Sequence, residues 1–276
     1  MAITAQDVKK LRDMTQAGMM DSKRALQEAD GDFEKAIEIL RKKGMKVSEK
    51  RKDREANEGL VVTRIADDGQ TGIIVEVNSE TDFVARNEEF ATFANGVADL
   101  ILSQRPADLD ALNALDFKGS RTVGEALSDL TGKIGENLGI RRFQILTSDA
   151  GQVVSYIHPG ARLGVLIDIQ GNGQLEEAGR DVAMQVAALN PVATRREEVP
   201  QAIQDKELEI GREAARNEGK PEHIIDRIAT GKLERYFKDH VLVEQPYVKD
   251  ASMTVKQRLQ QAEADVRTFI RFALGD

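Results

Sequence analysis

The feature that most limits how this chain can fold is an internal repeat. One pattern occurs twice: two strands joined by a turn, a helix, a helical insert and a closing strand. The second strands of the two predicted hairpins read TGIIVEVN at 71–78 and LGVLIDIQ at 163–170, and they match in residue type at nearly every position. Similarity of this kind indicates a duplicated supersecondary unit. We therefore expect an α+β fold with a duplicated β-β-α-β core.

The elements of each copy follow from the spacing of their apolar residues. Runs of β-branched residues between turn residues indicate strands, and apolar residues three and four positions apart indicate helices. In the first copy we expect strands at 60–66 and 72–77, helices at 88–102, 107–115 and 123–137, and a closing strand at 139–146. In the second copy we expect strands at 153–157 and 164–169, helices at 175–189, 199–217 and 222–240, and a closing strand at 266–274. The two copies would form subdomains at 59–148 and 149–276.

The helical insert of the second copy is highly charged. Its helices, 199–217 and 222–240, carry only narrow apolar stripes. Between them, Gly219 and Pro221 provide a helix stop followed by a helix start. We expect a helical hairpin at about 199–240 that projects from the body and pairs either with itself or with a second subunit, which would give a homodimer.

The region before the repeat is predicted to form three short helices. Thr4 and Asp7 have the spacing of a capping box, and Gly44 is expected to end the third helix in the left-handed conformation. This spacing resembles that of ubiquitin-associated three-helix domains, which predicts such a domain at 1–45. Met19 and Met20 would form either an adaptable contact surface or part of the small core.

Residues 46–58 are predicted to be a charged linker or a solvated helical extension, because Lys, Arg and Glu dominate there. The basic cluster at 42–54 would either contact nucleic acid or form a solvated surface. A net charge of −8 argues against nucleic acid as the main partner, because nucleic-acid binders normally carry a basic surface. A protein partner is the better expectation.

The cellular setting follows from what the sequence lacks. It contains no cysteine, which excludes disulfides and thiolate metal sites and fits a reducing compartment. Charged residues interrupt the apolar pattern of the first twenty positions, and no later apolar run reaches membrane-spanning length. We expect a cytoplasmic protein without a membrane contact.

The connection at 78–87 lies between a strand-like run and a helical run. Asn87 is a plausible N-cap for the helix that follows, which leaves Thr81, Asp82, Phe83 and Val84 without an obvious backbone role. In one interpretation Phe83 folds back onto the core and Asp82 accepts hydrogen bonds from backbone N–H groups. In the other, the four residues form a presented tip, since function collects in loops held by rigid elements. The matching connection of the second copy, 171–173, has no aromatic residue.

The sequence offers no constellation for covalent chemistry. Its three histidines, His158, His223 and His240, have no metal-ligand spacing. Neither a phosphate-binding Gly-rich loop nor a nucleophile elbow is present, so we expect no direct nucleotide binding, no cofactor and no metal. The chain is therefore predicted to act through its surfaces and not as an enzyme.

Four segments, in order along the chain, resemble elongation factor Ts. They are LRDMTQAGMM at 11–20, EVNSETDFVARN at 76–87, KIGEN at 133–137 and QPYVKD at 245–250. Members of this family are guanine nucleotide exchange factors for the GTPase elongation factor Tu. The resemblance implies that this chain binds elongation factor Tu in its GDP form and inserts the tip at 81–84, which displaces Mg²⁺ and promotes release of GDP.

The resemblance also implies contacts away from the tip. Ile134 and His158 align with family positions beside the inserted residues, and Met19 and Met20 would dock on another face of the GTPase domain. For His158 the alternative is a structural role at the end of a strand, before Pro159 and Gly160. The second copy and its helical hairpin would reach other domains of the partner or a second subunit.

A different class of function is a scaffold that bridges partners through the three-helix domain and the hairpin, with RNA bound at 41–54. That hypothesis predicts nucleic-acid affinity with a steep salt dependence and no effect of changes at Asp82 or Phe83. An exchange factor would show the opposite behaviour in both measurements.

Overall fold

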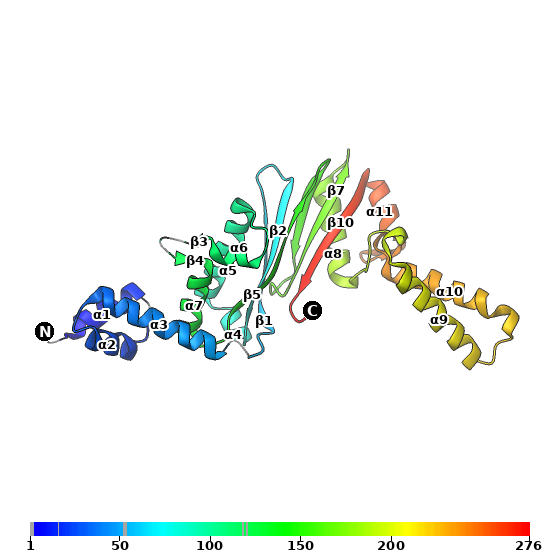
Figure 1. Cartoon of the computed structure of the whole chain (residues 1–276). Helices are drawn as coiled ribbons and strands as arrows, with labels where there is room; N and C mark the ends of the chain where they lie inside the picture. The colour runs from blue at the N-terminus through cyan, green and yellow to red at the C-terminus, as the bar shows by residue number, and fades with distance from the viewer. Residues whose placement is uncertain (1–2, 16, 52–53, 118, 120) are drawn as a thin grey trace. The chain divides into compact units, whose positions relative to one another are not determined.

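A computed structural model describes residues 3–15, 17–51, 54–117, 119 and 121–276 (Figure 1). The chain divides into two compact units. The first contains Met1–Val62, Val75–Phe143 and Leu274–Asp276, and the second contains Thr63–Ile74 and Gln144–Ala273. Helices and strands are both abundant, which confirms the predicted α+β class. The domain boundaries expected after residues 45, 58 and 148 stay predictions.

The first unit begins with the three predicted helices, α1 (Ala5–Thr15), α2 (Met19–Glu28) and α3 (Phe33–Arg51). The capping box at the start of α1 is confirmed, because the Asp7 N–H donates to Thr4 Oγ1 and the Thr4 N–H donates to Asp7 Oδ2. The buried residues of this small core come from all three helices: Val8, Leu11, Ala25, Leu26, Ala29 and Ala36.

Helix α3 does not end at Gly44, as the sequence predicted, but continues to Arg51. The glycine has a packing role instead. A Cβ on Gly132, in helix α7 (Val123–Ile134), would lie 2.6 Å from the Gly44 Cα, so the two helices cross where neither has a side chain. Gly44 is therefore needed for close approach of α3 and α7, not for chain reversal.

The first sheet has the strand order β1-β2-β5, built from β1 (Glu58–Ile65), β2 (Thr71–Ser79) and β5 (Gly139–Thr147). Every residue of the central strand β2 is buried. The helices that follow this hairpin are α5 (Glu88–Gln104) and α6 (Leu109–Ala114), and α7 completes the helical part. A short hairpin, β3 (Asp116–Phe117) and β4 (Arg121–Thr122), was not predicted.

The second sheet has the order β10-β7-β6, built from β6 (Gln152–Ile157), β7 (Leu163–Gly171) and β10 (Ala264–Ala273). Helix α8 (Leu175–Leu189) buries its apolar face on this sheet. The chain between the hairpin insert and β10 forms β8 (Pro246–Tyr247), β9 (Asp250–Thr254) and α11 (Val255–Gln261).

The two sheets confirm the duplication. In each, the second strand of the hairpin is central and the closing strand pairs with its other edge. Glycines recur as well: a Cβ on Gly59 would overlap the Val77 carbonyl oxygen, and a Cβ on Gly151 would overlap that of Ile169. Each central strand also carries a buried carboxylate at the same repeat position, Glu76 in β2 and Asp168 in β7.

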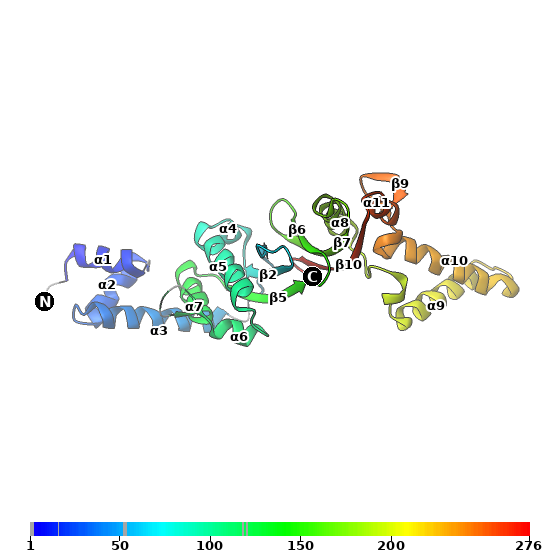
Figure 2. The ribbon, with the colours of Figure 1, turned by 90° about the horizontal axis from the view of Figure 1, so that it is seen from above.

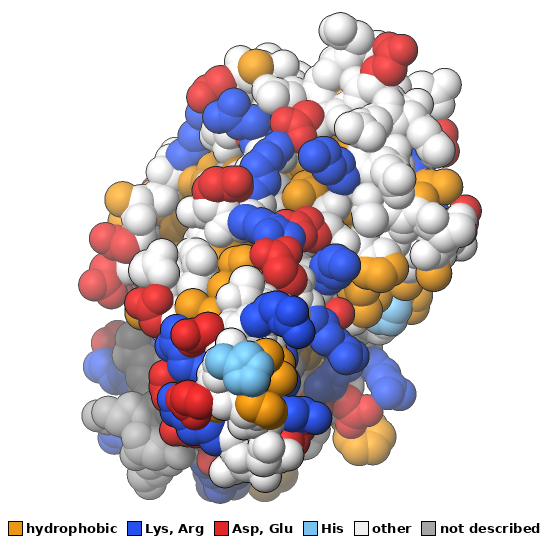
Figure 3. Space-filling model, turned by 90° about the vertical axis from the view of Figure 1, so that its right-hand side faces the viewer, with side chains coloured by type: hydrophobic (Ala, Val, Ile, Leu, Met, Phe, Trp, Pro, Cys, Tyr) orange, Lys and Arg blue, Asp and Glu red, His pale blue; other side chains and the backbone are white. Residues whose placement is uncertain are grey.

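The predicted helical hairpin consists of α9 (Gln201–Asn217) and α10 (Glu222–His240), which lie side by side (Figures 1 and 2). Gly211 allows close contact, because a Cβ there would lie 2.9 Å from the Ala229 Cα. Two short 3-10 helices, η1 (Arg196–Glu198) and η2 (Leu242–Glu244), flank the hairpin. On the face shown in Figure 3, acidic and basic side chains are interspersed.

One arginine fixes the base of this hairpin. The Arg196 guanidinium donates to Glu234 at 2.8 and 2.9 Å and to Glu244 at 2.7 Å. It also lies over the Phe237 ring, with its Cζ 4.6 Å from the ring centroid. Because paired carboxylates satisfy the planar donor fork, Arg196 links α10 to η2 in a defined geometry.

Within the described ranges, no helix is both long and apolar enough to cross a membrane.

Candidate protein-binding site

The candidate site is the connection between β2 and α5. Residues Asp82–Ala85 form a one-turn helix, α4, so the expected loop is in fact helical. Thr81 is its N-cap, and its Oγ1 accepts a hydrogen bond from the Val84 N–H at 3.5 Å. The prediction missed this turn because four residues show no helical periodicity.

Phe83 points away from the protein, with 79% of its surface exposed. Asp82 forms an ion pair with Arg86 across one helical turn, with the Nη2 and Oδ2 atoms 2.8 Å apart. Ala85, in contrast, is buried and anchors the turn. The interpretation in which Phe83 folds onto the core is therefore wrong, because the helical turn directs Ala85 inward and Phe83 to the opposite side.

Rigid elements hold both ends of this turn. The buried strand β2 leads into it, and the predicted N-cap of α5 is confirmed, since Asn87 Oδ1 accepts from the N–H groups of Glu89 and Phe90 at 2.8 and 3.3 Å. Exposure of a large aromatic side chain to water is unfavourable, and here no contact within the chain compensates for it. The arrangement is typical of a surface that binds another protein.

Two glutamates support the turn, and the sequence analysis assigned no role to either. The Glu136 carboxylate accepts hydrogen bonds from Thr81, and the Glu80 carboxylate accepts one from the Asn137 N–H. The Asn137 N–H is the main reason why the pKa of Glu80 is lowered from its ordinary value, and nearby Arg54 and Arg51 act in the same direction. Both glutamates lie within motifs that the sequence analysis quoted, but sequence spacing cannot show that the two segments meet.

Ile134 lies in the same unit, at the end of α7, and is half-buried. It stands two residues before Glu136, so the structure brings the segments 133–137 and 80–84 together. Met19 and Met20 occupy the start of α2, with 47% and 58% of their surfaces exposed. The alternative that they belong to the core is wrong.

His158 belongs to the second unit and is exposed after the end of β6. Its backbone N–H donates to the Leu163 carbonyl at 2.9 Å, and its imidazole Nδ1 is 3.0 Å from the Tyr156 hydroxyl. The strand-end role considered for His158 is thus present, and the residue is exposed.

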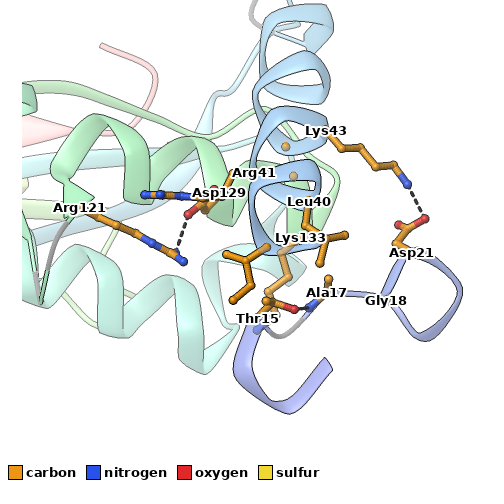
Figure 4. A pocket seen from close by; sticks show the side chains of 13 residues that line it. Thr15, Ala17, Gly18, Asp21, Leu40, Arg41, Lys43, Arg121, Asp129 and Lys133 are labelled. Carbon is orange, nitrogen blue, oxygen red and sulfur yellow. Dashed lines mark hydrogen bonds and ion pairs between the residues drawn. The ribbon is translucent and has the colours of Figure 1, made fainter. Parts of the chain in front are cut away.

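A cavity of about 190 Å³ lies between the three-helix module and α7 (Figure 4). Its charged side chains pair with one another or with neighbours: Arg121 with Asp129 at 2.5 Å, Lys43 with Asp21, and Lys133 with Glu89. Burial raises the pKa of Asp129 from its ordinary value. These paired charges explain how the two parts pack and do not indicate a ligand site.

The residues that the structure describes contain no group of three or more metal-ligating side chains. What they do present is an apolar side chain on a supported turn. The fold and this supported apolar turn are typical of proteins that bind another protein through their surface.

Comparison with known proteins identifies the family. A family model described as elongation factor TS matches residues 80–276, a range that begins at the base of the tip. The chain is 43% identical to elongation factor Ts of Chloroherpeton thalassium over 99% of both chains, and 45% identical to that of Chlorobaculum tepidum over 99% of both. It is 43% identical to elongation factor Ts of Alkalilimnicola ehrlichii over 100% of this chain and 93% of the relative. The chain belongs to the elongation factor Ts family, as the four sequence segments predicted.

Proposed function

We propose that this chain is a guanine nucleotide exchange factor that binds elongation factor Tu in its GDP form and inserts Thr81, Asp82, Phe83 and Val84 into it. Insertion displaces Mg²⁺ and promotes release of GDP. Membership of the elongation factor Ts family supports the choice of partner. The observation that carries the proposal for the tip is the 79% exposure of Phe83 on a turn supported from both sides.

The physical basis is the role of Mg²⁺ in nucleotide binding. The ion bridges phosphate oxygens and neutralises their charge, so disturbance of its ligands weakens binding of GDP without any contact to the base. Thermodynamic linkage requires that GDP weaken binding of the factor by the same ratio. No covalent step is needed, and in this proposal the chain itself holds neither nucleotide nor metal.

Magnitudes show that Phe83 needs help from other contacts. A thousandfold faster release requires about 4 kcal/mol off the barrier. Complete burial of one phenylalanine contributes roughly 1.5–3 kcal/mol. We therefore include Ile134, His158, Met19 and Met20 as further partner contacts.

Electrostatics favour a protein partner over nucleic acid. In the basic stretch, Lys42 pairs with Glu38 at 2.7 Å, and Arg54 pairs with Glu80 at 3.3 Å. Cations that are already paired offer less charge to a phosphate backbone. A translation factor with this partner would work in the cytoplasm, where elongation takes place.

The test is release of labelled GDP from elongation factor Tu with catalytic amounts of the chain. We expect acceleration by the wild type and loss of most of it in Phe83→Ala. Leu189→Ala is a matched control, because Leu189 is also an exposed apolar side chain (44%) but lies at the end of α8, outside the four family segments. A wild-type protein that leaves the release rate unchanged would refute the proposal.

A further inference from the structure

The tip is held by a reciprocal pair of glutamates. The Thr81 N–H donates to Glu136 Oε2 at 3.0 Å, and the Thr81 hydroxyl donates to Glu136 Oε1 at 2.7 Å. In return, the Asn137 N–H donates to Glu80 Oε1 at 2.6 Å. Each glutamate thus accepts the backbone N–H of the residue that follows the other. We call Glu80, Thr81, Glu136 and Asn137 the carboxylate clasp.

A glycine lets the chain turn so that the residues of the clasp can meet. Gly135 ends α7 in the left-handed conformation, with φ 82° and ψ 17°, and its N–H donates to the Thr131 carbonyl at 2.8 Å. The chain therefore leaves the helix abruptly, and the next two residues reach the base of the tip. A residue with a Cβ would be strained at this position.

The end of α3 closes the clasp from a third side. Arg51 and Arg54 lie 3.6 and 3.3 Å from the Glu80 carboxylate. The Asn137 side-chain amide donates to the Arg54 carbonyl at 2.7 Å. Glu80 is thus neutralised by cations, whereas Glu136 accepts hydrogen bonds from the two donors of Thr81.

Thr81 connects the clasp to the direction of Phe83. Its hydroxyl proton goes to Glu136, which leaves an oxygen lone pair to accept the Val84 N–H and cap α4. A helix of four residues is unstable alone because the first turn costs more entropy than one hydrogen bond returns. Orientation of the turn must therefore come from groups outside it. Two charge-assisted hydrogen bonds to one residue provide this.

We propose that Glu136 is a positioning residue for nucleotide exchange: it fixes Thr81, and through Thr81 it holds α4 in the orientation that presents Phe83. This inference rests on the proposed function of the tip. It assigns to the segment 133–137 a role in preorganising the chain before the partner binds.

The first test uses the free protein. Amide hydrogen exchange is measured by NMR in wild type, Glu136→Ala and Glu136→Gln. In Glu136→Ala, we expect the amides of Thr81, Ala85 and Arg86 to exchange roughly tenfold faster or more, because two charge-assisted hydrogen bonds are lost. Glu136→Gln, which keeps one acceptor oxygen, should be intermediate. The amides of β2 should not change in either variant.

The second test uses the complex with elongation factor Tu. In Glu136→Ala, the GDP release rate at saturating factor should fall by about tenfold, whereas the half-saturating concentration should change much less. Glu88→Gln is the matched control, because Glu88 is an exposed carboxylate close to the tip and should leave both values unchanged. Glu136→Gln, which keeps one acceptor oxygen for Thr81, should lose only part of the rate.

Faster amide exchange at the tip together with a lower saturating rate would support the inference. Unchanged amide exchange in Glu136→Ala, or a normal saturating rate despite faster exchange, would overturn it. If Glu136→Ala fails to fold, Glu136→Gln gives the same two readouts. A wild-type protein without exchange activity would refute the proposed function, whereas the amide data would still decide whether Glu136 orders the turn.

Discussion

The connections from β2 to α5 and from β7 to α8 occupy the same place in the two copies but are fixed in opposite ways. The first exposes Phe83 and is held by carboxylate side chains. The second is held by closeness of the backbone: a Cβ on Gly171 would overlap the Glu263 carbonyl oxygen, and one on Gly173 would overlap that of Ala262. The Asn172 N–H also donates to Glu263 at 3.1 Å.

The difference shows how a duplicated frame can be specialised at a single loop. Both copies keep the same strand order and a buried acid in the central strand. In both, the support comes from residues more than fifty positions away, but the first is held by carboxylate side chains and the second by backbone contacts. The order of the first connection therefore depends on side-chain hydrogen bonds, whereas that of the second depends on close backbone packing.

The largest loss of stability is expected from a substitution in the second connection. Gly173→Ala places a Cβ against the Ala262 carbonyl oxygen, and the backbone must move. We expect a loss of about 3 kcal/mol in the free energy of unfolding, measured with urea. Gly139→Ala is the control, because nothing lies within 4 Å of a Cβ at that position. Equal stability of the two variants would contradict the close approach.

The buried acids of the central strands give the next comparison. Glu76 accepts from Arg142 Nε at 2.7 Å, whereas Asp168 accepts from the Ser148 hydroxyl at 2.5 Å. Arg142→Ala leaves a buried charge with its closest cation removed and should cost about 3 kcal/mol of unfolding free energy. Ser148→Ala should cost about 1–2 kcal/mol. Urea unfolding of both variants measures the difference. A larger loss of stability in Ser148→Ala than in Arg142→Ala would contradict this ranking of the two contacts.

Helix starts after the two connections differ in capping. Asn87 caps α5 with its side chain, but Gln174 makes no side-chain cap at α8. Asn87→Ala should therefore destabilise the protein by about 1 kcal/mol, and Gln174→Ala should have almost no effect. Gln174→Ser should increase the unfolding free energy by roughly 0.5 kcal/mol. A loss of stability in Gln174→Ser would contradict this expectation and would indicate that the first N–H groups of α8 already have hydrogen-bond partners.

The smallest effect is a pH dependence restricted to the first connection. The pKa of Glu80 is lowered, chiefly by the Asn137 N–H, so its hydrogen bond stabilises the protein above the ordinary carboxyl pKa near 4.5 and is lost as pH falls through the lowered value. We expect constant order at the tip from about pH 6 to 8 and loosening only when the pH falls below the ordinary carboxyl pKa and through the lowered one. NMR titration of the Glu80 carboxyl carbon measures this. In Glu80→Gln the acid-dependent change should become smaller, and the part that remains belongs to the other carboxylates of the tip.

Much of the fold was predictable because it depends on local periodicity. The repeat, the hairpins, helix α8 and the capping residues Thr4 and Asn87 follow from residue spacing and local hydrogen bonding. The short β3–β4 and β8–β9 hairpins were not predicted, since two-residue strands leave no periodic signal.

The remaining features depend on contacts that residue spacing does not encode. A glycine near the end of a helical pattern predicts that the helix stops there. The facing Gly132 shows that Gly44 instead allows close contact between two helices, which the sequence alone does not reveal. The sequence allowed two positions for Phe83, packed on the core or exposed, and could not distinguish them, because burial depends on residues that are distant in the sequence. The support from Glu136 joins positions 55 residues apart, so the sequence could name the two segments but not their contact.

The crossing of α3 and α7 also limits the angle between these two helices. Arg51 lies seven residues beyond Gly44 on the same continuous helix, a distance of about 10 Å at 1.5 Å per residue. A tilt of α3 by about 5° around the glycine contact would move that end by nearly 1 Å. A movement of this size away from Glu80 would take the 3.6 Å separation between Arg51 and Glu80 past the ~4 Å range of an ion pair, unless the flexible arginine side chain followed it. The angle at the glycine crossing therefore sets how far the Arg51 side chain must reach to the base of the tip.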